Sequence, residues 1–391
     1  MTKASAIYQL GHLPIKDHVF SPDRTILAVT KENEVEIYKI NPARLSDKPK
    51  LVANLRDHDK TVTSVDISPD GSRVLTCSQD RNALVWEFRD GEFKPTLVLL
   101  RINRAATVCR WSPDGQKFAV GSSDRIIAVC YYEAENDWWI SKHLKKPIKS
   151  TITTLDWHPN GVLLASGSTD GHVRVFSGYI KGIDNKPEPS VWGTKLPFQT
   201  LCGDFTNETL AWIHGVKFSP NGDALAWVAH DSSIGVVYPQ GEGLAPRSIL
   251  NVRTNYLPFE SVVWASDNSI VVGGFNCNLV VFKGDESNWQ EAYQIEEQKD
   301  LTKETPRNRN NNNNDDNDDD DQEITSHQAL NMFKQMDLKG RVNKPSMGSS
   351  TGKAAKALST IHQNTIVSIK NFANGQVSTS GIDGKVVIFN V

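Results

Sequence analysis

A repeated phrase constrains the fold of this chain more than any other feature of its sequence. Each copy has a run of Val, Ile, Leu and aromatic residues, a Pro-Asp-Gly or Pro-Asn-Gly turn, a second run, an Asp turn and a third run. Proline presets the first turn position and Asp-Gly or Asn-Gly supplies the tight reversal, so each copy predicts antiparallel strands. Four clear copies and three weaker ones begin, in that order, at Val62, Ala106, Ile152, Ile213, His18, Phe259 and Asn364.

The spacing of the copies predicts how the strands assemble. The turn prolines fall at 22, 69, 113 and 159, which is the period of about 45 residues of a four-stranded propeller blade. The sequence therefore predicts an all-β, seven-bladed β-propeller occupying residues 1–391 as a single domain. The last copy ends on its third strand, "KVVIFNV". We expect the orphan strand Ala6–Leu10 to complete that blade, because a closed ring leaves no unpaired sheet edge.

The second copy resembles the WD-repeat family in its side chains as well as its spacing. Its His58, Ser78, Asp80 and Trp86 stand at the offsets of that family, and the resemblance implies a buried hydrogen-bond chain within a blade. A catalytic role is the alternative for the turn acids, but an Asp at this place caps a strand-to-strand turn through its own backbone. The same turn acid recurs in other copies as Asp124, Asp170, Asp231 and Asp383.

Composition and motifs favour a non-enzymatic cytosolic protein. The formal net charge of −3 gives no global attraction to nucleic acid, and no apolar run is long enough to be a signal peptide or to span a membrane. The five cysteines are scattered and never form CxxC, which predicts buried free thiols in a reducing compartment. Neither a GxxxxGK[ST] loop nor HExxH is present, so we expect no catalysis, cofactor or metal. The histidines mostly occupy repeat-equivalent places, for example His18, His58 and His362.

Two stretches interrupt the period. Residues 180–200 are rich in Pro and contain Trp192 and Phe198, which suits either a surface loop packed by its own aromatics or a partner contact. Residues 285–361 form a longer insertion that opens with "NWQEAYQIE", the expected outer strand of the sixth blade. The Asn/Asp run that follows, within about residues 303–323, cannot bury apolar surface and predicts a disordered, solvated linker.

The insertion also predicts one amphipathic helix, over residues 325–339, between blades six and seven. Thr325 and Gln328 form a capping box and Gly340 supplies the stop. A helix this short is marginal alone, so its apolar face must dock, either on the propeller or in a groove of a partner. That face is defined by the i, i+3, i+4, i+7 positions Ala329, Met332, Phe333 and Met336.

A local basic cluster is the second candidate surface. It lies near Trp138 and Trp139 in the sequence, and its residues are either solvated strand ends or a contact site for a partner. The cluster consists of Arg101, Arg104, Lys142, Lys145, Lys146 and Lys149.

Longer phrases carry a more specific resemblance. "LRINRAATVCRWSP", "ENDWWISKHLKKPIKSTITTLDWHPN", "WGTKLPF" and "WIHGVKFS" occur in order and are similar to the family of subunit 1 of the actin-related protein 2/3 complex. The resemblance implies a non-catalytic scaffold in the cytoplasm, at cortical patches of the actin cytoskeleton. It covers nearly the whole chain, apart from the Asn/Asp run and its neighbourhood.

That resemblance also implies partners. They are the other subunits of the complex, including its two actin-related proteins, the actin filament, and nucleation-promoting factors with acidic tails. In the family, the inserted helix docks into a groove on an actin of the mother filament. The resemblance implies that the residues making this contact here are Ala329, Leu330, Met332, Phe333 and Met336. The basic cluster would contact neighbouring subunits or the acidic tails. The rival hypothesis is a WD-repeat adaptor of another assembly, such as a ubiquitin ligase or a chromatin complex.

Overall fold

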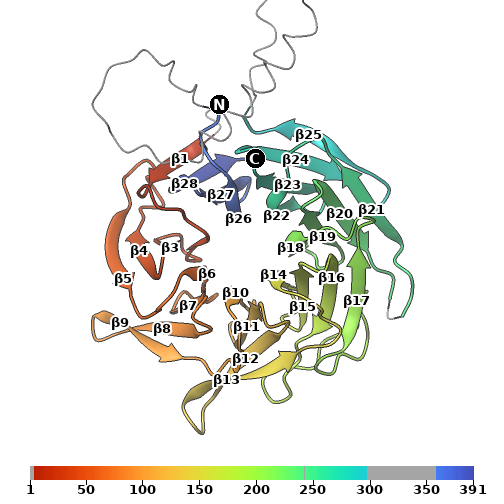
Figure 1. Cartoon of the computed structure of the whole chain (residues 1–391), viewed down its shortest axis with the longest axis horizontal. Coiled ribbons are helices and arrows are strands. Elements are labelled where there is room, and N and C mark those ends of the chain that lie inside the picture. The colour runs from red at the N-terminus through yellow and green to blue at the C-terminus, as the bar shows by residue number, and fades with distance from the viewer. Residues whose placement is uncertain (1–3, 242, 297–357) are drawn as a thin grey trace, which may run out of the picture. The chain divides into compact units, whose positions relative to one another are not determined.

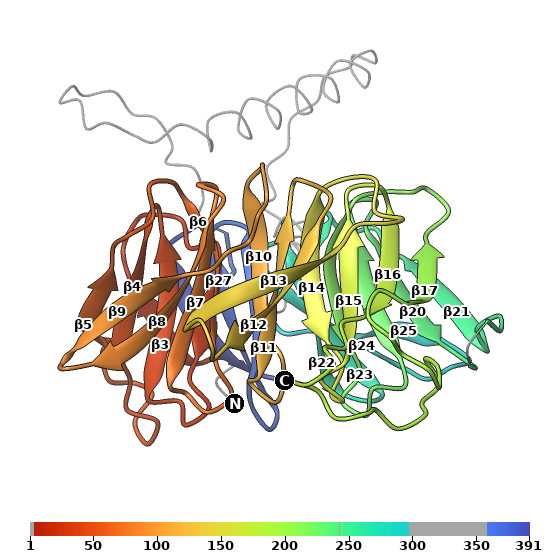
Figure 2. The same cartoon turned by 90° about the horizontal axis from the view of Figure 1, so that it is seen from below.

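The computed structural model describes residues 4–241, 243–296 and 358–391. Residues 4–296 and 360–391 belong to one compact unit, which is a ring of seven sheets, each with four antiparallel strands. Figure 1 looks down the axis of this ring, and Figure 2 shows the strands running between its two faces. The predicted all-β, seven-bladed propeller is confirmed.

The strands of each blade follow one another outward from the ring axis. Blade 1 contains β2 (His18–Phe20), β3 (Ile26–Lys31), β4 (Glu34–Lys39) and β5 (Lys50–Leu55). Blade 2 contains β6 (Val62–Ile67), β7 (Arg73–Ser78), β8 (Ala83–Arg89) and β9 (Glu92–Leu97). Blade 3 contains β10 (Ala106–Trp111), β11 (Lys117–Ser122), β12 (Ile127–Glu133) and β13 (Trp138–Leu144). Blade 4 contains β14 (Ile152–Trp157), β15 (Leu163–Ser168), β16 (His172–Ser177) and β17 (Leu201–Thr206).

The last three blades keep this order except at the closure. Blade 5 contains β18 (Ile213–Phe218), β19 (Leu225–Ala229), β20 (Ser233–Tyr238) and β21 (Ser248–Arg253). Blade 6 contains β22 (Phe259–Ser266), β23 (Ser269–Gly274), β24 (Leu279–Gly284) and β25 (Trp289–Gln294), the last confirming the outer strand predicted at the start of the insertion. Blade 7 contains β26 (Ile366–Ala373), β27 (Gln376–Gly381), β28 (Lys385–Asn390) and β1 (Ala4–Gln9).

The ring closes through its first strand, as predicted. Figure 1 shows β1 beside β28, and their register pairs Ala6 with Ile388 and Tyr8 with Val386. Ala6 and Tyr8 are buried, and the N–H of Leu10 donates to the carbonyl of Gly384 at 3.0 Å. Closure therefore supplies apolar contact as well as backbone hydrogen bonds.

The turns have the chemistry that their sequence predicts. In blade 2 a carboxylate oxygen of Asp70 accepts from the Ser72 N–H at 3.1 Å, and Gly71 has φ of 75°, a left-handed value that glycine adopts without strain. The inner strand of each of blades 2–7 carries a register shift near its start, for example between Val62 and Ser64. The repeat in the sequence is thus a repeat of backbone geometry.

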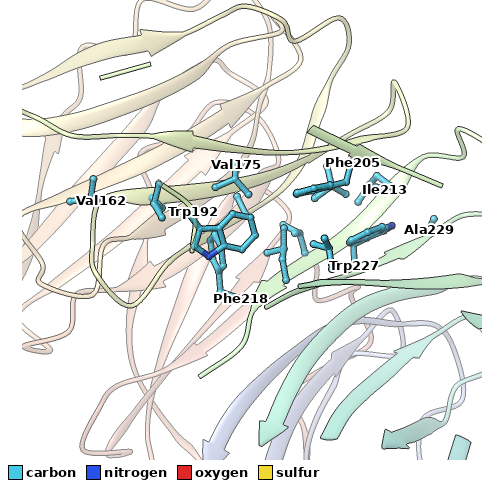
Figure 3. Close-up of a cluster of buried hydrophobic side chains, with 14 of the residues drawn as sticks. Val162, Val175, Trp192, Phe205, Ile213, Phe218, Trp227 and Ala229 are labelled. Atoms are coloured by element: carbon cyan, nitrogen blue, oxygen red, sulfur yellow. The ribbon is translucent and has the colours of Figure 1, made fainter. Parts of the chain in front are cut away.

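The apolar core lies within and between neighbouring blades. The long loop after β16 contributes to it, because Trp192 is 1 % exposed and packs edge-on against Phe218 with ring centroids 5.4 Å apart (Figure 3). The indole N–H of Trp192 donates to the carbonyl of Gly222 at 2.7 Å, and Phe198 packs half-buried against the core between blades 3 and 4. Of the two roles open for this loop, packing by its own aromatics is the one observed.

The predicted linker at 303–323 and the predicted helix at 325–339 lie outside the described residues. Within the described ranges, no helix has the length and apolar character needed to cross a membrane. None of the five cysteines, all of which lie in the described ranges, forms a disulfide, and all but the half-buried Cys202 are buried.

Candidate interaction surfaces

One face of the ring is organised by the Asp turns between the second and third strands of the blades. We call it the turn face. Four of these acids accept a backbone N–H from the connection that arrives from the preceding blade. Asp80 accepts from Asp59, Asp124 from Asn103, Asp170 from Lys149 and Asp383 from Gln363, at 2.9–3.1 Å. These four turn acids thus tie blades 2, 3, 4 and 7 to their incoming loops.

The blade 2 network has one member that sequence reasoning missed. His58 Nδ1 lies 2.8 Å from Asp80 Oδ2, and His58 Nε2 lies 2.8 Å from Thr76 Oγ1. The indole N–H of Trp86 donates to the same Thr76 hydroxyl at 2.9 Å. Ser78 stands beside this chain, since its hydroxyl donates to the Lys60 carbonyl and accepts the Asp80 N–H. Thr76 precedes Ser78 by two residues, so alternation of a strand could have placed it on the same side.

Blade 7 repeats this arrangement and the other blades vary it. His362 lies between Asp383 at 3.1 Å and Thr379 at 2.8 Å. Asp170 instead pairs with the buried guanidinium of Arg174 at 3.0 Å. Asp231 accepts from the Thr209 hydroxyl and the Asn207 amide. These differences reflect which donor the incoming loop or the next strand supplies.

His18 is not at a repeat-equivalent place, which corrects the expectation for it. It belongs to the inner strand β2, and its ring nitrogens lie 3.0 and 2.9 Å from the hydroxyls of Ser380 and Ser378 in blade 7. Burial, and then the charge of Lys370, lower the pKa of His18 to about 3, so the side chain is neutral at pH 7. It is a contact between blades 7 and 1 instead of part of an Asp–His chain.

Part of the basic cluster converges on the turn face at blade 3. The guanidinium of Arg101 donates to the Ser141 carbonyl, and the ring of His143 lies 2.7 Å from the Leu100 carbonyl. Burial lowers the pKa of His143, and the nearby charges of Lys145 and Arg101 lower it further. Arg101 and Lys145 therefore share one neighbourhood, with the exposed Arg104 and Lys146 on the same two connections.

The other residues of the cluster lie apart from that centre. The ammonium group of Lys142 is 5.8 Å from the ring centroid of Tyr131 and 5.9 Å from that of Phe198, over the join of blades 3 and 4. Lys149 is exposed beside the Asp170 turn of blade 4. Trp138 and Trp139 stand at the opposite end of β13, Trp139 in the core and Trp138 44 % exposed. The aromatic pair does not belong to the basic surface.

The ring axis encloses a cavity of about 530 Å³ walled by the inner strands. Asp17 is the most connected group there. Its carboxylate lies 3.0 Å from the guanidinium of Arg110 and 3.4 Å from the ammonium of Lys370, and it accepts hydroxyl hydrogen bonds from Ser64 and Ser368. One residue of blade 1 thus joins blades 2, 3 and 7. The described residues contain no group of three or more His, Cys, Asp or Glu side chains that could hold a metal ion.

A closed seven-bladed ring with Asp turns, joined in blades 2 and 7 to a His and a Thr, defines a WD-repeat propeller. The family model described as WD domain, G-beta repeat matches residues 49–87, 102–129 and 140–177. Over 99 % of its length the chain is 46 % identical to actin-related protein 2/3 complex subunit 1 of Saccharomyces cerevisiae, of which the alignment covers 97 %. The subunit 1 of Schizosaccharomyces pombe is 42 % identical over 97 % of each chain, and subunit 1A-A of Xenopus laevis 39 % identical over 98 % of this chain and 96 % of the relative. The chain belongs to the family of actin-related protein 2/3 complex subunit 1.

Proposed function

We propose that this chain is a non-catalytic scaffold subunit of an actin-related protein 2/3 complex, in which it supports nucleation of branched actin filaments. The observation that carries the proposal is the identity of 46 % along nearly the full length of a protein named as subunit 1 of that complex. The closed ring suits the role, because a propeller offers two faces and a rim to several partners on one rigid frame. The expected place of work is the cytoplasm, at the actin cytoskeleton and its cortical patches.

Purification of the tagged full chain from its own cells, with mass spectrometry of stoichiometric partners, tests this assignment. We expect the other subunits of the complex, including the two actin-related proteins. Recovery of ubiquitin-ligase or chromatin subunits instead would favour the rival WD-repeat adaptor and remove the actin assignment.

The first finer proposal concerns the filament. The apolar pattern at Ala329, Leu330, Met332, Phe333 and Met336 supports docking of residues 325–339 into a groove on a filament subunit, with Phe333 as the main anchor. Assembled complex with Phe333→Ala should form fewer branches per unit filament length. The matched control is Gln335→Ala, which stands off the apolar pattern and should branch like wild type. Equal branching by the Phe333 variant would remove the helix from the mechanism.

The second finer proposal concerns the basic surface on the turn face. We assign it to acidic segments, either the tails of nucleation-promoting factors or neighbouring subunits, because Arg101 and Lys145 stand together there and neither forms an ion pair within the described residues. Lys145→Glu with Lys146→Glu should weaken the binding of an activator tail, and the loss should be larger at low salt. Lys94→Glu, a charge reversal on the outer strand of blade 2, is the control for a site away from the basic surface. Unchanged activator affinity and unchanged subunit content in the double variant would refute the assignment.

A further inference from the structure

An exposed aromatic patch stands on the turn face between blades 4 and 6. We call it the Trp212 patch and define it by Leu210, Trp212 and His230. Leu210 is 54 % exposed and Trp212 56 % exposed, which is unusual for side chains of this size in a ring whose other tryptophans are mostly buried. The rings of Trp212 and His230 lie 5.8 Å apart, and the N–H of His230 donates to the Trp212 carbonyl at 2.8 Å. Two neighbouring loops thus present exposed apolar and aromatic side chains on the same face.

The backbone that carries the patch is held firmly. Asn207 binds the incoming loop from both sides, because its amide donates to Asp231 at 3.1 Å and its side-chain oxygen accepts the Ala211 N–H at 3.2 Å. The carbonyl of Leu210 presses on Gly171 so closely that a Cβ added there would lie 2.4 Å from it. Because the backbone around Trp212 is already held in place, binding through this side chain should cost little conformational entropy. Anchor residues of protein interfaces share this property.

The surroundings of the patch carry negative charge. Asp231 accepts hydrogen bonds from hydroxyl and amide groups at the edge of the patch, and Glu208 lies on the same loop as Trp212. The carboxylate of Glu260 lies 3.3 Å from His214 Nδ1, and His214 Nε2 lies 2.9 Å from His230 Nδ1.

His214 and the nearby arginine do not cancel this charge. Burial, and then His230, lower the pKa of His214 to about 4, so it is neutral at pH 7. The guanidinium of Arg253 pairs with Glu208, with both groups exposed. Burial raises the pKa of the Glu260 carboxyl, so Glu260 is left out of the count. Glu208 and Asp231 against Arg253 leave a local formal charge of about −1 at pH 7. This sign is opposite to that of the basic surface on blade 3 of the same face.

We propose that the Trp212 patch docks a basic segment of another protein, in which lysines or arginines flank one apolar side chain that packs on Trp212 and Leu210. Charge complementarity predicts that the partner segment is positively charged. Its lysines or arginines would face Glu208 and Asp231, whereas an acidic segment would be repelled here. The stacking surface of Trp212 also suits an arginine guanidinium. The proposal goes beyond the acidic partners assigned to the basic surface and does not depend on them, because the two surfaces select opposite charge.

Fluorescence anisotropy with three labelled twelve-residue peptides tests the proposal on the purified full chain. The first alternates Lys-Arg pairs with Leu, the second replaces Lys and Arg by Glu, and the third replaces Leu by Ser. We expect only the first to bind measurably at about 50 mM salt, and Trp212→Ala to weaken it at least tenfold. Glu208→Lys should weaken it severalfold. Trp138→Ala is the matched control, since it removes another exposed tryptophan from blade 3, and it should bind like wild type.

A photo-crosslinking residue at position 212 in the native assembly then identifies the occupant. A crosslinked segment with net positive charge and an apolar residue supports the proposal. Crosslinks to an acidic segment or to a second copy of this chain would overturn it. Equal binding of the Leu and Ser peptides would also overturn it, as would a Trp212→Ala variant that binds like wild type. Either result would mean that only non-specific charge attraction holds the peptide.

Discussion

Asp17→Asn should lower the free energy of unfolding of the ring strongly, because this one carboxylate contacts two cations. The side chain of Asp17 is 5 % exposed and neutralises Arg110 and Lys370, whose side chains are 20 % and 19 % exposed. Burial alone raises the pKa of the Asp17 carboxyl, but the two cations outweigh burial and hold the pKa far below its usual range. The native structure therefore depends on the charged form of this carboxylate.

The magnitude follows from the two cations that the substitution leaves behind. Removing one partner of a buried ion pair costs about 3–5 kcal/mol, since the remaining charge stays desolvated without a counter-ion. Arg110 and Lys370 keep about a fifth of their side-chain surface exposed, and the charge of Asp66 also acts on both, so we expect the lower end, about 3 kcal/mol. At ~2–4 °C per kcal/mol for a chain of this order of size, the melting temperature should fall by roughly 6–12 °C.

Urea denaturation and thermal melting of the purified full chain measure this change. Asp90→Asn is the control, because Asp90 forms an exposed ion pair with Lys94 and its side chain is 82 % exposed. Such pairs contribute about 0–1 kcal/mol, so its midpoint should stay close to wild type. If Asp17→Asn and Asp90→Asn shifted the midpoint equally, water in the cavity would be solvating the two cations, and the role given to Asp17 would be wrong.

Three further outcomes are expected. Deletion of residues 1–11 should lower the melting temperature by more than about 5 °C, because it removes the closing strand and the buried Tyr8, and an unchanged melt would show that the last blade holds without it. Thr76→Val should cost about 2–3 kcal/mol in urea denaturation, since it leaves the polar atoms of His58 and Trp86 without their shared partner; a loss below 0.5 kcal/mol would contradict that chain. Stability should also fall as pH drops from about 6.5 toward 4, because the unfolded chain protonates His18 at its ordinary pKa whereas the folded ring holds that pKa near 3. His18→Gln removes one titrating group, so the dependence of the unfolding free energy on pH should become weaker by about 1.4 kcal/mol per pH unit. An unchanged dependence would show that other groups cause the effect.

Most of the fold could be predicted from the sequence, because it depends on interactions between residues that are close together in the chain. Pro-Asp-Gly turns, alternating apolar runs and the repeat length depend on neighbours within one blade, so the number of blades and the closing strand could be predicted without long-range information. The closing strand shifted only slightly, from Ala6–Leu10 to Ala4–Gln9. The same locality explains why Asp80 and Asp124 were placed correctly on turns.

Patterns in the sequence predict each blade, whereas the contacts between blades depend on the closed ring. Asp17 stands in an unremarkable run, "IKDHVF", and becomes a junction of four blades only because ring closure brings blade 7 against blade 1. His18 looked repeat-equivalent by type, yet its partners lie about 360 residues away in the chain. Lys142 lies over Tyr131 and Phe198, apart from the other basic residues, because the loop after β16 of blade 4 packs against blade 3. Contacts across a closed ring depend on register between blades, which no pattern within a single repeat records.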